Sequence, residues 1–252
     1  MHTQCDPRRL QFRLAGLLLA SLALNPAGFA QPAKLSLTSG GAPPLTASPN
    51  HPGFLDELAK AMFKRIGVEV EVTAVPTERS LINVNAGIDD GDLFRVAGVE
   101  VEYPNLIRIP EKIMDNDFVA FTKRTDIRIR RWADLKPYSV AYTTGWKIYD
   151  RNVKGVQELV TTASINGLPS LLDNNRVDVI LMDRWQGQWV LQQTGHQFML
   201  QEPPLASVEI FTYLNKKHAA LVPKLAQALR DMKADGSYQK IYNATLKPLD
   251  TR

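Results

Sequence analysis

Residues 53–72 read GFLDELAKAMFKRIGVEVEV, and they contain one helix followed directly by one strand. Gly67 stands where a helix C-terminus is expected, and residues 68–72 alternate apolar with acidic side chains, as a half-buried strand does. Before Gly67, apolar residues recur every three or four positions and form a single stripe along a helix: Leu55, Leu58, Ala59, Met62, Phe63 and Ile66. The stretch therefore predicts a helix packed beside the strand that follows it.

The same order of elements extends to both sides of this stretch. Residues 34–38 alternate as an earlier strand, and a helix is expected over 76–87. A further strand is expected at 117–122, before the polar connection at 123–131. After this connection the pattern starts again, with expected strands at 138–142, 156–160, 177–182 and 208–214. Helices are expected near 147–151, at 168–174, at 183–195, through 221–232 with a stop at 235, and at 237–246. Residues 202–204 read as a further connection. Alternating strands and helices predict parallel sheets in an α/β fold, with two units and a ligand cleft between them.

The composition excludes several classes of protein. Thirty Lys and Arg against 26 Asp and Glu leave a net charge of +4, and scattered basic residues of this kind do not indicate nucleic-acid binding. One Cys excludes a disulfide scaffold and a thiolate-rich metal site, and the four His lack metal-ligand spacing. The turn at 89–92 lacks the ligand spacing of a calcium loop, so we expect it to be solvated. No metal or cofactor is predicted.

Residues 1–30 have the three parts of a secretory signal peptide. Basic residues Arg8, Arg9 and Arg13 precede an apolar run at 14–24, and the small-residue end is Gly28-Phe29-Ala30. We expect cleavage near Ala30 and export to the periplasm. Cleavage there removes the single cysteine, and no later apolar stretch is long enough to anchor the chain in a membrane.

Three stretches of this sequence resemble the bacterial extracellular solute-binding proteins of family 3, the periplasmic components of polar amino acid uptake systems. They are the run at 53–72, NNRVDVILMD at 174–183 and KADGSYQKIYNATL at 233–246. Their counterparts in the family look like GFdvdLakaiakrlGvkvefv, GrvDaiigD and kaDGtyqkIykkwf. The three occur in order and at the right separations, and the resemblance covers most of residues 34–246.

The resemblance implies a periplasmic binding protein-like type II fold, with two α/β lobes joined by hinge strands. It places residues 31–122 and 209–252 in the first lobe and 123–208 in the second, with hinges near Phe121 and Ile210. Family members close on a small polar ligand and hand it to the permease of an ABC transporter. We therefore expect a monomer that binds an amino-acid-like molecule.

The resemblance also implies roles for residues of the second lobe. Family members bind the amino acid carboxylate with an Arg of the first lobe and with N–H groups of the second, and they bind the ammonium with an Asp. Asp183 matches that Asp, and its alternative role is the N-cap of the following helix. Thr144, Gly145 and Trp146 match the N–H-donating turn. Trp146 replaces a hydroxyl residue, and it either stacks on a flat ligand or serves in packing.

The first lobe departs from the family pattern. A Ser/Thr-x-Thr-x-x-Arg stretch is absent from residues 90–113, so the carboxylate-binding Arg must be sought elsewhere. The two candidates are Arg95 and Arg79, the latter in the run PTERSLINVNAG at 76–87. Either is alternatively an ordinary surface ion pair. Phe54 is the expected aromatic wall of the cleft, with a role in the core as its alternative.

An enzyme is not expected, because no nucleophile, metal cluster or placed acid–base pair is evident. The same fold also carries cyclohexadienyl dehydratases, for which Glu78 or Asp183 would be the candidate general acid. A third interpretation is a sensor that presents its ligand to a membrane receptor instead of a permease. Neighbouring genes would distinguish these two partners.

Overall fold

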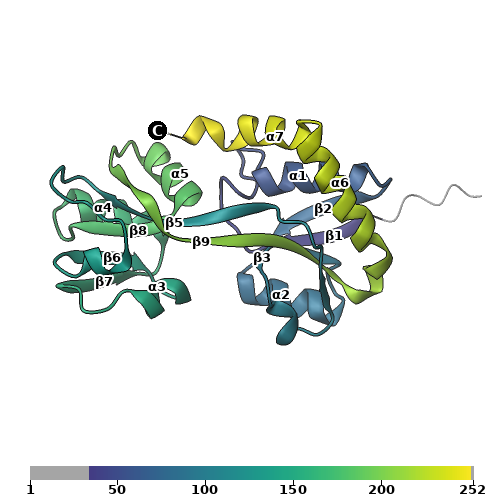
Figure 1. The fold of residues 1–252 in the computed structure, drawn as a ribbon, viewed down its shortest axis with the longest axis horizontal. Coiled ribbons are helices and arrows are strands. Elements are labelled where there is room, and N and C mark those ends of the chain that lie inside the picture. Colours follow the sequence, from purple (N-terminus) through teal and green to yellow (C-terminus); the bar gives the residue numbers. More distant parts are fainter. Residues whose placement is uncertain (1–33, 251–252) are drawn as a thin grey trace, which may run out of the picture. The chain divides into compact units, whose positions relative to one another are not determined.

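The computed structural model describes residues 34–250, and the predicted signal peptide at 1–30 lies outside the described residues. The described residues belong to one unit. They contain one sheet with the strand order β2-β1-β3-β9-β5-β8-β6-β7, and β4 pairs with β9 beside this path (Figure 1). The strands are β1 (Lys34–Ser39), β2 (Glu69–Ala74), β3 (Gly91–Val96), β4 (Leu106–Arg108), β5 (Met114–Thr122), β6 (Ser139–Thr143), β7 (Glu158–Thr162), β8 (Val179–Asp183) and β9 (Met199–Asn215).

Helices connect most of these strands. None of those in the described part of the chain is long and apolar enough to cross a membrane. The α-helices are α1 (Phe54–Lys64), α2 (Thr77–Ala86), α3 (Lys147–Asn152), α4 (Leu168–Asp173), α5 (Arg184–Thr194), α6 (Val222–Ala234) and α7 (Ser237–Thr245); the 3-10 helices are η1 (Val99–Val101), η2 (Trp132–Leu135), η3 (Ile165–Gly167), η4 (Lys216–Leu221) and η5 (Lys247–Leu249).

The first sheet half, β2-β1-β3, is parallel. The predicted apolar stripe is buried except for Ile66, which lies beyond the end of α1. The stripe packs against α6 through Leu225, Leu229 and Met232. Burial of each such side chain contributes about 2 kcal/mol. On the opposite face, Leu81 and Val84 of α2 form a smaller cluster (Figure 1). The predicted helix and strand at 53–72 are thus confirmed as α1 and β2.

The second sheet half, β8-β6-β7, is also parallel and carries one apolar cluster on each face. One cluster contains Leu168 and Leu172 of α4 with Leu191 of α5. The other contains Tyr149 of α3 and Leu135 of η2. The three strands predicted at 138–142, 156–160 and 177–182 are present within two residues of their expected bounds.

The long strands β5 and β9 pair antiparallel and run from one sheet half to the other (Figure 1). The connection predicted at 202–204 is wrong, because β9 continues through Pro203 and Pro204. The register with β5 shifts between Phe118 and Ala120, so the prolines lie in an irregular part of the ladder. A residue without an N–H group is tolerated at such a shift.

The solvated turn predicted at 89–92 is also wrong. Gly91 and Asp92 begin β3, and Asp92 is fully buried. Asp90 accepts from the Ser36 N–H at 2.8 Å and lies 2.8 Å from Lys217 Nζ. Asp90 is therefore held by partners far away in the sequence, which no local pattern indicates.

Gly53 precedes α1 with φ of +77°, in a region that favours glycine. A Cβ at this position would lie 2.3 Å from Ala47 N and 2.5 Å from Thr46 C, both backbone atoms. We expect Gly53→Ala to lower the free energy of unfolding by about 2–3 kcal/mol. Urea denaturation measures this change. Gly67→Ala is the control, because its φ is similar, at +74°, and nothing lies within 4 Å of the added Cβ. An equal loss in both variants would contradict the steric argument.

Candidate ligand-binding site

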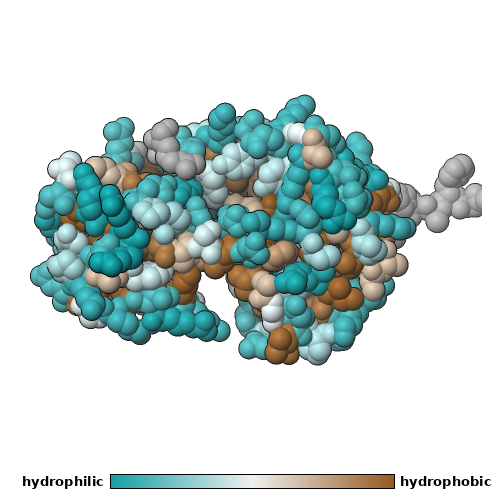
Figure 2. Space-filling model, in the orientation of Figure 1, coloured by the Kyte–Doolittle hydropathy of each residue, from teal (hydrophilic) through white to brown (hydrophobic). Residues whose placement is uncertain are grey.

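The candidate residues gather at the carboxyl ends of the parallel strands. In the first sheet half, β1 leads into Gly40, where an added Cβ would lie 2.7 Å from Thr77 Oγ1 and 3.1 Å from Arg95 Nη1. In the second, β6 leads into the Thr144 turn and β8 ends at Asp183. Open parallel sheets bind ligands outside the carboxyl ends of their strands. Figure 2 shows the surface hollowed between the segments that carry α2 and α3, which begin beside Thr77 and Trp146.

Asp183 has the geometry of an N-cap. Its Oδ1 accepts from the Gln186 N–H at 3.0 Å, and its backbone is extended. Its Oδ2 is buried and has no hydrogen-bond partner among the described residues. Burial raises the pKa of Asp183 to about 7, although the N–H groups of Gln186 and Trp185 favour the charged form. Capping occupies one carboxyl oxygen and leaves the other for a donor, so the two predicted roles are compatible.

Tyr149 lies close to this carboxyl group, and no pattern in the sequence singles it out. Its hydroxyl is buried without a hydrogen-bond partner in the described part of the chain. Burial, and then the charge of Asp183, raise its pKa well above the usual value. Both groups are therefore buried with unused hydrogen-bonding capacity, and the charge of Asp183 acts on Tyr149. Such groups are rare in folded proteins, and they often mark binding sites.

Aromatic rings surround Tyr149. Its ring centroid lies 5.7 Å from that of Phe118 and 5.9 Å from that of Trp146, the latter pair being stacked. Phe118 and Trp146 meet edge to face at 5.8 Å. Trp146 is half-buried against this cluster, so it packs on the protein in the way that one of its two predicted roles requires.

The turn at 143–146 only partly matches its predicted role. The Thr144 N–H donates to Thr162 O at 2.9 Å, so it is not free for a carboxylate. Thr144 and Gly145 are exposed. Gly145 has φ of +89°, and a Cβ added to it would meet no atom within 4 Å, so this glycine serves the turn conformation and not a close contact.

Arg95 is buried, and its guanidinium is committed to its own sheet half. Its Nη2 lies 2.5 Å from Asp92 Oδ2 and donates to Thr77 O at 3.0 Å. Asp92 also accepts from Ser80, which pairs with Thr38 at 2.6 Å. The alternative role of Arg95 in a surface ion pair is wrong, because the side chains of this pair are only 7% and 0% exposed. This network links the end of β1 and the neighbouring part of β3 to α2.

Arg79, unlike Arg95, is neither buried nor paired within the described residues. It lies in the first turn of α2 and is exposed, and it has no ion pair or hydrogen bond with the residues at 34–250. Its neighbour Glu78 accepts from the Tyr103 hydroxyl at 2.5 Å. Within residues 34–250, Arg79 is therefore unpaired at its whole guanidinium, whereas Arg95 has partners at Nη2 and a buried Nε without one.

Phe54 is part of the hydrophobic core. It is 0% exposed and meets Tyr238 and Tyr242 edge to face, at 5.7 and 6.4 Å between centroids. The expectation that Phe54 forms a wall of the cleft is wrong. Phe54 is the first residue of α1 and continues its apolar stripe, so its ring packs against the rings of α7. Among residues 34–250, no group of three or more His, Cys, Asp or Glu is placed to hold a metal ion.

Comparisons with known proteins bear on the family and the fold of this chain. The family model of the bacterial extracellular solute-binding proteins, family 3, matches residues 37–247. An uncharacterized protein of Shewanella oneidensis is 27% identical over 185 residues, which are 70% of this chain and 69% of that protein.

Solved structures share the type II periplasmic binding protein-like fold. An ancestral arginine-binding protein bound to arginine has a TM-score of 0.66 at 21% identity, covering 84% of this chain and 97% of that one. The GluR0 ligand-binding core in complex with L-glutamate has a TM-score of 0.72 at 14% identity, with 87% and 100% covered. The probable amino-acid ABC transporter extracellular-binding protein ytmK from Bacillus subtilis has 0.73 at 14%, with 86% and 98% covered. With its family model matched over most of its length, the chain belongs to the bacterial extracellular solute-binding proteins of family 3.

Proposed function

We propose that this solute-binding protein captures an amino-acid-like molecule in the periplasm and delivers it to the permease of an ABC transporter, without chemistry. The proposal rests on two groups without partners in the described part of the chain, a carboxyl oxygen that accepts from a cation and a guanidinium that binds an anion. Asp183 Oδ2 has no hydrogen-bond donor within the described protein, and Arg79 has no carboxylate there. An amino acid carries one ammonium and one carboxylate, so it complements both groups.

The ammonium would bind between Asp183 and Tyr149, in the second sheet half. A nearby cation favours the charged form of Asp183, so binding at pH 7 would draw this carboxyl group toward full ionisation. Because Asp183 is fully buried, neighbouring side chains must move before a ligand reaches Oδ2. We propose that the exposed turn of Thr144 and Gly145 moves, together with Trp146, when the ligand binds.

The carboxylate would bind Arg79 from the other sheet half, with the Thr144 hydroxyl as a further donor. A ligand held from both halves favours their closure, and β5 and β9 join the halves. We propose that these strands are the hinges, with lobe boundaries after residue 122 and after residue 208. Their long shared ladder supports this assignment.

A thermal-shift screen of amino acids, polyamines, small organic acids and sugars tests the proposal. A ligand at a hundred times its dissociation constant stabilises the native state by about 2.7 kcal/mol, which raises the melting temperature measurably. A shift confined to amino acids or their close analogues is the expected result. Shifts confined to sugars would contradict the charge argument.

Arg79→Ala is expected to leave the melting temperature of the unliganded protein unchanged, because its side chain is exposed and unpartnered within residues 34–250. It should weaken binding of the amino acid found in the screen by about ten- to a hundredfold, which is the contribution of a hydrogen bond to a charged group. Isothermal titration calorimetry measures the affinity. Lys64→Ala, an exposed cation on α1, is the matched control. Equal affinities in the two variants would show that Arg79 does not bind the ligand.

A further inference from the structure

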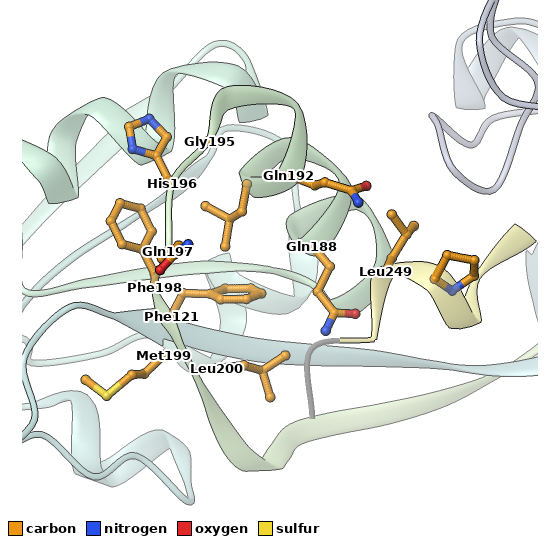
Figure 3. A pocket seen from close by; sticks show the side chains of 12 residues that line it. Phe121, Gln188, Gln192, Gly195, His196, Gln197, Phe198, Met199, Leu200 and Leu249 are labelled. Atoms are coloured by element: carbon orange, nitrogen blue, oxygen red, sulfur yellow. The ribbon is translucent and has the colours of Figure 1, made fainter.

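A cavity of about 640 Å³ lies away from the carboxyl ends of the strands, among residues of β5, α5, the first residues of β9 and η5 (Figure 3). Its volume is in the range of small-molecule sites. Asp183 caps one end of α5, and the α5 residues that line the cavity begin at Gln188, five residues and roughly 8 Å further along the helix axis. None of the residues proposed to bind the amino acid lines this cavity, so the two sites use different side chains.

The buried amide of Gln188 is the distinctive polar group of this cavity. The residue is 4% exposed, and neither its amide nitrogen nor its amide oxygen has a hydrogen-bond partner within the described protein. Its neighbours in the cavity wall include Phe121, Leu200 and Leu249, and Figure 3 shows the amide between the two leucines. Most buried amides are hydrogen-bonded, so an amide whose nitrogen and oxygen both lack partners is a candidate for ligand binding.

Within the described part of the chain, the cavity wall carries no Lys, Arg, Asp or Glu. Its one titratable residue there is His196, whose Nδ1 lies 3.0 Å from Asp173 and whose ring stacks on Phe198 at 5.2 Å. A charged ligand would lose its hydration here without gaining a counter-charge. The wall thus selects for a neutral molecule with an apolar body.

We propose that this cavity is a second ligand site, for a small neutral molecule that joins a ring to a planar amide-like group. The ligand amide would donate to Gln188 Oε1 and accept from Gln188 Nε2, while its ring would lie on the side of Phe121 and Leu200. The terminal torsion of a Gln side chain is soft, so a rotation turns the amide edge that carries both atoms toward the cavity. This site is independent of the proposed amino acid site.

Benzamide is the probe, because it has an apolar ring and both halves of an amide pair. In an NMR titration of the purified protein, benzamide should shift the side-chain NH₂ signals of Gln188, which are identified by their loss in Gln188→Met. Acetophenone keeps the ring and the carbonyl but lacks the N–H donors. It should bind the wild type about five- to tenfold more weakly than benzamide does, the difference expected for one hydrogen bond.

Three variants complete the test. Gln188→Met should bind benzamide and acetophenone equally and melt no lower than the wild type, because methionine fills similar space without the amide atoms. Gln193→Met, an exposed neighbour on α5 outside the cavity wall, should bind as the wild type does. Asp183→Asn should also retain benzamide binding. Equal binding of both probes by the wild type, unchanged benzamide affinity in Gln188→Met, or loss of binding in Asp183→Asn would each overturn the proposal.

Discussion

Without ligand at pH 8, the Asp183→Asn variant is expected to be more stable than the wild-type protein by about 4 kcal/mol. Burial raises the pKa of Asp183 from 3.8 to about 7, so at pH 8 the fold must hold an ionised carboxylate that burial disfavours. One unit of pKa corresponds to about 1.4 kcal/mol, and the shift covers about three units. Asparagine carries no charge, and it remains a good N-cap.

The sign and the pH window of this effect follow from the raised pKa. The favourable contribution of protonated Asp183 is complete below about pH 3.8 and is lost as the pH rises to about 7. The difference in free energy of unfolding between variant and wild type should therefore grow over this window and level off above it. Urea denaturation from pH 4.5 to 8.5 measures the difference.

Asp178→Asn is the matched control, because Asp178 directly precedes β8 and Asp183 ends it. The Ser139 N–H and hydroxyl and the Arg124 guanidinium hold the pKa of Asp178 below its usual value despite partial burial. Its loss should destabilise the protein at pH 8. A difference between wild type and Asp183→Asn that does not vary with pH would show that Asp183 is ionised throughout, and would contradict the burial argument.

Arg95→Met is expected to lower the free energy of unfolding by about 3–5 kcal/mol at pH 8. It removes the cation from Asp92, which is fully buried, and leaves that carboxylate with an uncompensated charge. Burial raises the pKa of Asp92 and the Arg95 charge opposes this rise, so the loss should shrink as the pH falls and Asp92 takes up a proton. Urea denaturation at pH 5 and pH 8 tests both statements.

The double variant Arg95→Met/Asp92→Asn isolates the pair. Asparagine at 92 keeps a partner for Ser80 without a charge, so the double variant should recover most of the stability lost in Arg95→Met. Arg79→Met, an exposed Arg of the same sheet half, should change stability by less than about 0.5 kcal/mol. Equal losses in Arg79→Met and Arg95→Met would show that Arg95 is a surface residue in solution.

Elements with a clear hydrophobic period were predictable from the sequence. The helix stripe at 55–66 and the apolar run at 177–182 indicate burial by spacing alone, and they correspond to α1 and β8. Gly195, the predicted end of a helix, ends α5 with φ of +74°. These features depend on neighbours within four residues, so the local pattern contains the information.

The interactions that the sequence did not indicate are long-range. Buried Asp92 accepts from Ser80 of α2, and Ser80 in turn pairs with Thr38 of β1, whereas the cation beside it is Arg95 of the same strand. Tyr149 lies on a six-residue helix, which is too short for a periodic signal, and Trp146, whose ring stacks on it, precedes this helix as its N-cap.

The sequence by itself determined the family and most of the helices and strands, because these depend on local spacing or on short runs of residue types. It missed β3 and β4, it interrupted β9 at 202–204, and it left the N-cap at Asp183 as one of two roles. Only the tertiary structure decided which Arg is free. Arg79 and Arg95 both lie near loops where a carboxylate-binding Arg is plausible. Thr77 and Asp92 bind Arg95, whereas no residue in the described part of the chain binds Arg79. Burial of a long charged side chain is set by the groups that the fold brings to it, and those groups can be remote in the chain.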